Sequence, residues 1–214
     1  MACKNVSFFA NPDGTHCYQA AIKMAVKYFL PNVNYNWDEL DALTAKKPGL
    51  WTWPLAGILW LKSLGFDTYI VSNFDYDRFV TLGSDYLIEY SGREVGDAQI
   101  ANSDIAKERC FAKQACKTEL IKCRVPKIKE ICRILDKGYL LICNVNSRAL
   151  SGKPGYVGHF VLVYGHADDS LLLHDPGPAP KPSRVVPFDI FESAWAYPDE
   201  NAKDYIAIKL QQNV

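Results

Sequence analysis

The sequence predicts a single α+β domain over residues 1–214, in which an N-terminal helical part packs on a C-terminal antiparallel β-sheet. The chain has the length of one domain, and its 49% hydrophobic residues are enough to form a core. Apolar residues recur at helical spacing in the first half, whereas the second half contains continuous apolar runs bounded by turn residues. Helices followed by strands, without regular alternation, are typical of the α+β class.

The first expected helix covers about residues 16–30. Its candidate N-caps are Asp13 and Thr15, and Pro31 closes the segment. Small and apolar side chains recur along this stretch at the spacing of one helix face. Cys17 therefore lies in the first turn of the predicted helix.

Three further helices are predicted from the signals at their ends. Asn36 and Glu39 form a capping-box pattern that opens a short second helix. A proline at the start and a glycine at or just past the end delimit a third helix at residues 54–65 and a fourth at residues 126–136.

The segment from about residue 85 to residue 124 is the most polar part of the chain. Its second half, residues 103–123, has helical composition. A lid over a cleft and a solvated surface helix are both open interpretations. We favour the surface helix, because polar helices usually face water.

Four apolar segments predict strands, and two of them form a candidate hairpin around the loop 165–169. The four segments are residues 139–145, 159–164, 170–174 and 206–210. If Tyr164 pairs with Ser170, His159 falls opposite Asp175 and both side chains point to the same face. At that spacing a carboxylate accepts a hydrogen bond from one imidazole nitrogen, which fixes the tautomer and leaves the other nitrogen free.

Cys17 is the candidate partner for this His–Asp pair. A thiol at a helix N-terminus lies near the positive end of the helix dipole and near free amide groups, both of which favour the thiolate. A neighbouring imidazole would complete a thiolate–imidazolium pair, which is an activated nucleophile. The backbone amide of Cys17 is also placed to donate to a developing oxyanion.

Each of these residues also has a purely structural interpretation. Cys17 is in helical register with Ala21 and Met24, which suits an inert core thiol. A lone histidine on a strand, such as His159, is usually a satisfied structural group, and Asp175 before Pro-Gly suits a turn. Taken singly, the structural interpretation is favoured for every one of them, so the case for chemistry rests on their combination.

Composition excludes several classes of function. The 24 basic and 24 acidic residues give no net charge, which removes the electrostatic case for nucleic acid as a partner. No apolar stretch reaches the roughly 18 residues of a membrane span, and the N-terminus lacks the pattern of a signal peptide.

The odd number of cysteines favours reduced thiols and a cytoplasmic location, and without a C-x-x-C pair we expect no metal. The seven cysteines are Cys3, Cys17, Cys110, Cys116, Cys123, Cys132 and Cys143.

Taken together, the motifs resemble those of the C39-like peptidases, a family of the papain-like cysteine peptidase superfamily. Asn11–Met24 is similar to the helix that carries the family's cysteine, and Gly152–Gly165 contains a similar Gly-His-Phe-Val strand. His174–Gly177 is similar to the family's Asp-Pro turn, and Phe191–Trp195 to its Phe…Trp segment. The resemblance covers most of the chain in the expected order, while residues 85–124 match only loosely.

The resemblance implies a papain-like fold with Cys17 as the nucleophile, His159 as base and then acid, and Asp175 orienting the histidine. It also assigns the oxyanion hole to Asn11, at the position where the family usually has glutamine. Gln19 is a second candidate amide donor. Tyr18 departs from the glycine that commonly follows the family's cysteine, and its bulk would narrow the cleft.

Three functions follow as hypotheses. The first is a thiol protease or amidohydrolase that forms an acyl-thioester on Cys17 and hydrolyses a peptide or amide bond. The second is an acyltransferase or amide synthase that passes the acyl group from a thioester or amide donor, for example a carrier-protein-bound one, to an amine. The third is an inactive binding module. No organic cofactor is expected, and the tryptophans at 51, 53 and 60 fit an apolar pocket and core packing equally well.

Overall fold

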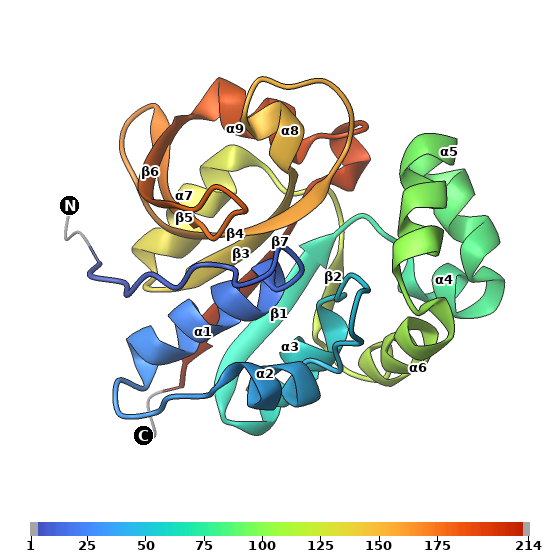
Figure 1. Cartoon of the computed structure of the whole chain (residues 1–214), viewed down its shortest axis with the longest axis horizontal. Helices are drawn as coiled ribbons and strands as arrows, with labels where there is room; N and C mark the ends of the chain where they lie inside the picture. Colours follow the sequence, from blue (N-terminus) through green and yellow to red (C-terminus); the bar gives the residue numbers. More distant parts are fainter. Residues whose placement is uncertain (1–3, 212–214) are drawn as a thin grey trace.

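The computed structural model describes residues 4–211, which form a mixed α/β fold around one seven-stranded sheet (Figure 1). The strand order is β2-β1-β7-β3-β4-β5-β6; β1 and β2 are parallel, and all other neighbours are antiparallel. The strands are β1 (Phe66–Ser72), β2 (Ile121–Cys123), β3 (Leu140–Asn146), β4 (Gly158–His166), β5 (Ser170–Asp175), β6 (Lys181–Pro187) and β7 (Asp204–Leu210).

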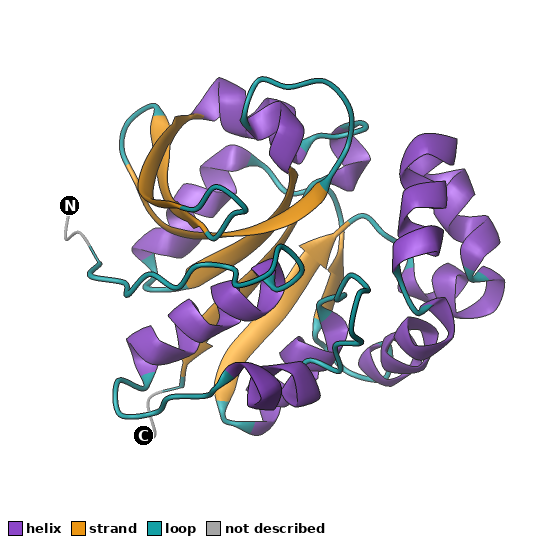
Figure 2. Cartoon of the chain, in the orientation of Figure 1, coloured by secondary structure: helices purple, strands orange, loops and turns teal. Residues whose placement is uncertain are grey.

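Helices cover both faces of the sheet (Figure 2). The helices are α1 (Cys17–Phe29), α2 (Trp37–Leu43), α3 (Leu55–Ser63), α4 (Tyr76–Leu82), α5 (Ser84–Asn102), α6 (Ile105–Ala115), α7 (Ile128–Asp136), α8 (Ser147–Leu150), α9 (Phe188–Trp195) and the 3-10 turn η1 (Glu200–Ala202). Along β3, Leu140 and Ile142 pack in the core with α1, whereas Leu141 and Cys143 pack in the core with α7 and α9. Burial on both faces explains why the strands are continuous apolar runs.

The four predicted helices are confirmed as α1, α2, α3 and α7, with ends within a few residues of the expected ones. The capping box at Asn36 is present, since its side chain accepts from the Glu39 amide and the Glu39 carboxylate accepts from the Asn36 amide. The predicted caps of the first helix are wrong: His16 is the N-cap residue and makes no side-chain capping bond. Asp13 instead accepts hydrogen bonds from Thr15 and His16.

The four predicted strands are confirmed as β3, β4, β5 and β7, but the sequence analysis missed β1, β2 and β6. β2 has three residues, and β6 is an edge strand whose side chains are mostly exposed. Polar residues and prolines are usual on sheet edges and hide the apolar pattern of a strand. β1 is apolar but lies among the helices of the first half, where no strand was expected.

The polar middle of the chain forms helices that lie beside the edge of the sheet, next to β1 and β2 (Figure 1). α5 is interrupted at Gly92, whose φ of 73° belongs to the left-handed region that glycine adopts most easily. α6 packs against α3 and α4. Within residues 4–211, every helix is too short or too polar to span a bilayer.

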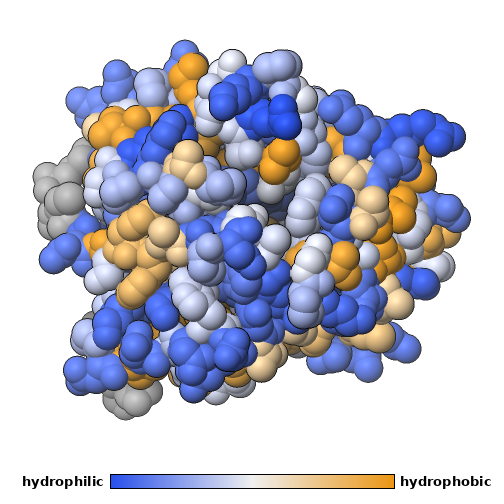
Figure 3. Space-filling model, viewed as in Figure 1, coloured by the Kyte–Doolittle hydropathy of each residue, from blue (hydrophilic) through white to orange (hydrophobic). Residues whose placement is uncertain are grey.

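Most of the face seen in Figure 3 is hydrophilic, and its apolar side chains occur in small groups. One exposed apolar residue, Val185, belongs to the edge strand β6. The six cysteines in the described part of the chain are all free thiols, and Cys3 lies outside it.

Gly57 allows α3 to approach α1 closely. A Cβ atom at this position would lie 2.5 Å from the hydroxyl of Tyr18 and 2.8 Å from Cδ1 of Ile22. The Tyr18 hydroxyl donates to the Pro54 carbonyl at 2.8 Å, so it is not free to move aside. We therefore expect Gly57→Ala to lower the free energy of unfolding by about 1–3 kcal/mol, measured by urea denaturation.

Gly165→Ala is the matched control, because a Cβ there would make ordinary contact with Leu172 at 3.5 Å. An unfolding free energy for Gly57→Ala as high as that of the control would contradict the close approach of the two helices.

Candidate active site

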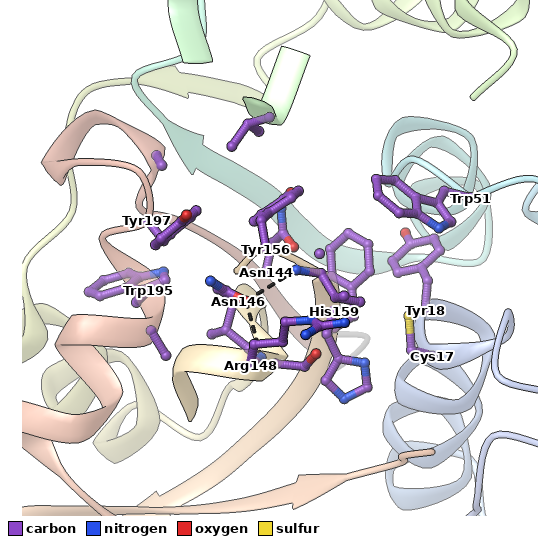
Figure 4. A pocket seen from close by; sticks show the side chains of 18 of the residues that line it. Cys17, Tyr18, Trp51, Asn144, Asn146, Arg148, Tyr156, His159, Trp195 and Tyr197 are labelled. Carbon is purple, nitrogen blue, oxygen red and sulfur yellow. Dashed lines mark hydrogen bonds between the residues drawn. The ribbon is translucent and has the colours of Figure 1, made fainter. Parts of the chain in front are cut away.

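Three segments distant in sequence meet at one cavity of about 650 Å³. Cys17 is the first residue of α1, His159 is the second residue of β4, and Asp175 is the last residue of β5. All three line the cavity, and Figure 4 shows Cys17 and His159 on the same side of it. The structure therefore brings together the three residues that the sequence analysis selected.

His159 links the other two side chains. Its Nε2 lies 2.8 Å from Oδ1 of Asp175, and the Cys17 thiol is close enough to the ring for the two groups to shift each other's pKa. Since Asp175 occupies Nε2, the nitrogen left for the thiol is Nδ1. Burial lowers the pKa of His159, but hydrogen bonds and charges from Asp175 and Cys17 outweigh it, so the pKa is raised above its usual value.

The Cys17 thiol has the opposite shift. Burial raises the pKa of the thiol. Interactions with His159 and with the backbone amides of Phe160 and Tyr18 lower the pKa, and together they outweigh the effect of burial. The net pKa lies below the usual value of a thiol, although the residue is only partly exposed. A lowered thiol pKa beside a raised imidazole pKa favours a thiolate–imidazolium pair.

Asp175 is held from three sides. Besides His159, it accepts from the Gly177 amide at 3.1 Å and from Nη1 of Arg184 at 3.2 Å. Burial raises the pKa of Asp175, but the hydrogen bond and charge of His159, with smaller contributions from Gly177 and Arg184, lower it, and the net pKa lies below its usual value. Arg184 also donates to the Leu150 carbonyl, so it fixes the carboxylate against the rest of the fold.

The hairpin register differs from the predicted one. Leu162 pairs with His174, and a bulge falls between Val163 and Gly165, so Tyr164 does not pair with Ser170. The pairing at Leu162 and Val163 is two residues away from the predicted one, which makes His159 and Asp175 diagonal neighbours. Because side chains alternate with a period of two, this shift keeps both residues on the same face.

Packing between α1 and β4 aligns the thiol with the imidazole. The ring of Tyr18, next to Cys17, lies 5.0 Å from the ring of Phe160, next to His159. Tyr18 is also fixed by its hydrogen bond to Pro54 and is 1% exposed. This aromatic pair joins the helix to the strand at the residues that follow Cys17 and His159.

The amide side chains near Cys17 already have partners. Asn11 Nδ2 donates to the Gly177 carbonyl at 3.0 Å, and Asn11 Oδ1 accepts from the amides of Gly14 and His16. Asn11 is not among the described residues that line the cavity. Gln19 is fully buried and donates to Thr44 and Thr52. The Gly177 carbonyl takes one of the two Nδ2 protons of Asn11, so the oxyanion role implied for Asn11 would require the side chain to turn its second proton toward the cavity.

Several cavity residues were not selected from the sequence. α5, in the polar middle segment, forms one wall with Leu87, Tyr90 and Val95. Of the three tryptophans left open, Trp51 and Trp53 line the cavity. These residues come from separate segments and share no spacing, so no sequence pattern distinguishes them from core residues.

If the three residues act as a catalytic unit, we expect Asp175→Asn to lower kcat by on the order of 100-fold on any substrate that the protein turns over. A neutral amide can accept the His159 hydrogen bond but cannot stabilise the imidazolium by charge. The pKa of His159 should fall, so the loss of activity at high pH should begin at a lower pH, measured as a pH profile of kcat.

Asp136→Asn is the matched control. Asp136 also forms a His–Asp pair, since its Oδ1 lies 3.0 Å from Nε2 of His166, and neither residue lines the cavity. An Asp175→Asn profile that matches the control in height and position would exclude this role for Asp175.

Comparisons with known proteins agree with the architecture. No protein-family model and no curated protein matches the sequence. Among solved structures, the peptidase domain of Streptococcus ComA, a bifunctional ABC transporter involved in a quorum-sensing pathway, is 16% identical with a TM-score of 0.53. That match covers 97% of this chain and 100% of the ComA domain. A C39-like peptidase from Bacillus anthracis is 13% identical with a TM-score of 0.48, covering 98% of this chain and 97% of its own.

The similarity to the ComA domain spans the seven-stranded sheet and its helices from end to end. At 16% identity this similarity establishes the architecture alone, so the chemistry has to be argued from the residues of the cavity. The chain thus has the mixed α/β, papain-like fold of the C39-type peptidase domains.

Proposed function

We propose that this protein is a cysteine-nucleophile acyl-transfer enzyme that hydrolyses a peptide or amide bond. The observation that carries the proposal is the placement of Cys17, His159 and Asp175 on the wall of one cavity, with His159 hydrogen-bonded to Asp175 and its ring beside the thiol. The shifts of the thiol and imidazole pKa values toward an ion pair support the same chemistry.

In the first half of the reaction, the Cys17 thiolate attacks the substrate carbonyl and a C–S bond forms. The oxyanion is held by the backbone amide of Cys17, which lies in the first turn of α1 and has no intrahelical acceptor. The His159 imidazolium then gives its proton to the leaving amine as the C–N bond breaks, which leaves an acyl-thioester on Cys17.

In the second half, His159 removes a proton from water, and the resulting hydroxide attacks the thioester. The C–S bond breaks, the carboxylic acid leaves, and the thiolate and imidazolium are restored. Asp175 stays ionised and keeps the Nε2 proton of His159 directed away from the sulfur. Asn11 has a structural role, because its side-chain oxygen organises the loop that leads into α1.

Intact-protein mass spectrometry during turnover of activated acyl esters tests this proposal. A transient mass increase equal to the acyl group, mapped to Cys17 and followed by release of the free acid, is the expected result. A panel of esters and peptide amides that yields neither adduct nor product would reject it.

Transfer to an amine is a second candidate, favoured by the charge at the cavity mouth. Arg148, Lys153 and Lys181 line the cavity and are exposed. Positive groups there would suit a phosphate-bearing donor such as an acyl-phosphopantetheine, as carried by a carrier protein. Acyl-phosphopantetheine supplied with a primary amine should then yield an amide, and formation of free acid alone would exclude this candidate.

A further inference from the structure

The cavity extends well beyond the Cys17–His159 pair. In Figure 4 it continues past Asn144 and Tyr156 toward Trp195 and Tyr197, on the side opposite Cys17. Tyr76 and Tyr90 also line it. The far end of the cavity is therefore mainly aromatic, which suits an apolar group or a cation that contacts ring faces.

One carboxylate, Asp204 at the start of β7, lines this aromatic end. Its Oδ1 accepts from the backbone amide of Asn144 at 3.1 Å, where the hydrogen-bond ladder between β3 and β7 ends. Among the described residues, none donates to Oδ2. One oxygen of this carboxylate is thus fixed by the sheet, and the other is left for the contents of the cavity.

Within residues 4–211, no positively charged side chain pairs with Asp204. The adjacent Lys203 pairs with Glu192 and Glu200 instead. The titratable groups that interact with Asp204 are all neutral acids: Tyr76 on α4, Tyr90 on α5, Tyr156 before β4 and Cys143 on β3. Burial without a counter-charge raises the pKa of Asp204 to about 7. A carboxylate in such a place is costly to ionise unless a cation accompanies it.

The position of Asp204 relative to His159 gives the length of a suitable ligand. His159 pairs with Val145, the neighbour of Asn144, and Asn144 in turn binds Asp204. The backbones of His159 and Asp204 are therefore separated by two strand spacings, or about 10 Å. A lysine or arginine side chain next to the reacting carbonyl, together with one hydrogen bond, covers this distance.

We propose that the aromatic end of the cavity is a subsite for a cationic group of the substrate, with Asp204 as the residue that pairs with a lysine ammonium or arginine guanidinium close to the scissile bond. This inference rests on the proposed function. The carboxylate supplies the charge and the surrounding rings supply cation–π contacts. The enzyme then prefers peptides or acyl compounds with a basic side chain on the acyl side.

Dipeptide aminomethylcoumarin amides test the preference, with lysine or its uncharged analogue norleucine at the first or second residue from the reacting carbonyl. At pH 8 the wild-type protein should favour lysine at one of these positions by about tenfold or more in kcat/KM. The preference should shrink at pH 6, because Asp204 is then mostly protonated. Taking the lysine-to-norleucine ratio at each pH cancels the titration of Cys17 and His159.

Asp204→Asn is the decisive variant, because its amide oxygen can still accept from Asn144 while its charge is lost. Its preference for lysine should disappear, so that the ratio of its kcat/KM values for the lysine and norleucine substrates falls to about one. A lysine preference that survives in Asp204→Asn, or is absent from the wild type at both positions, would overturn the subsite.

Failure of the proposed function gives a different result, namely no hydrolysis of any substrate in the panel. The subsite is then tested by calorimetric binding of acetyl-lysine amide against acetyl-norleucine amide. Tighter binding of the lysine compound to the wild type alone supports the subsite without catalysis, and equal binding to the wild type and Asp204→Asn rejects it.

Discussion

Replacing Cys17 by alanine will remove acyl-enzyme formation and lower turnover by on the order of 10⁴-fold or more. No other group near the carbonyl can replace the thiolate, since His159 is directed at the sulfur and Asp175 at His159. The measurements are the acyl adduct by intact mass and kcat/KM on the best substrate. Both should fall together, because the thioester is an obligatory intermediate of the proposed mechanism.

Cys132→Ala is the matched control. Cys132 is also a partly exposed thiol on a helix, but it does not line the cavity, and burial raises its pKa. The control should keep full activity and the full adduct. If Cys17→Ala retains the adduct, a different residue carries the acyl group and the proposed mechanism is excluded.

Replacing His159 by alanine will produce the second large effect, a loss of the reactive form of Cys17 near neutral pH. The imidazolium lowers the pKa of the thiol, so in the variant this pKa returns to or above the usual range, and the thiol stays protonated at pH 6. Alkylation of Cys17 by iodoacetamide at pH 6 should slow by about tenfold or more. The difference should vanish at high pH, where the thiolate forms in both proteins.

Alkylation rates are measured by peptide mass spectrometry, with the Cys116 and Cys132 peptides as internal references, because the pKa of both thiols is raised in the folded protein. Equal rates for Cys17 at pH 6 in wild type and His159→Ala would show that no ion pair forms. That outcome would favour the inactive binding module over either enzyme.

Much of the candidate site was predictable, because it depends on local chemistry and on which face of the sheet a side chain occupies. It does not depend on the exact register of the strands. Counting along the hairpin gives the wrong partner for Tyr164, since a bulge between Val163 and Gly165 cannot be seen in the sequence. The error is an even number of residues, so His159 and Asp175 still share a face. Cys17 is found because the spacing of small and apolar residues predicts a helix over about residues 16–30, even though the predicted caps were wrong.

The remaining features depend on contacts between distant segments. Arg184 supports Asp175 from an exposed edge strand, and nothing in its sequence surroundings marks that strand. Asp204 enters the cavity only because β7, the last strand of the chain, inserts between β1 and β3. The hydrogen bond from Asn11 to the Gly177 carbonyl requires the turn at Gly177 to lie beside the loop before α1. Sequence spacing carries no information on any of these contacts between distant segments.

The thiol and the imidazole belong to different layers, one at the tip of a helix and the other within the sheet. Their alignment depends on the seam formed by Tyr18 and Phe160. A small slip along that seam separates sulfur from nitrogen while both hydrophobic cores remain intact. Catalytic competence is therefore more fragile than the fold itself, and it should fade under mild denaturation before the chain begins to unravel.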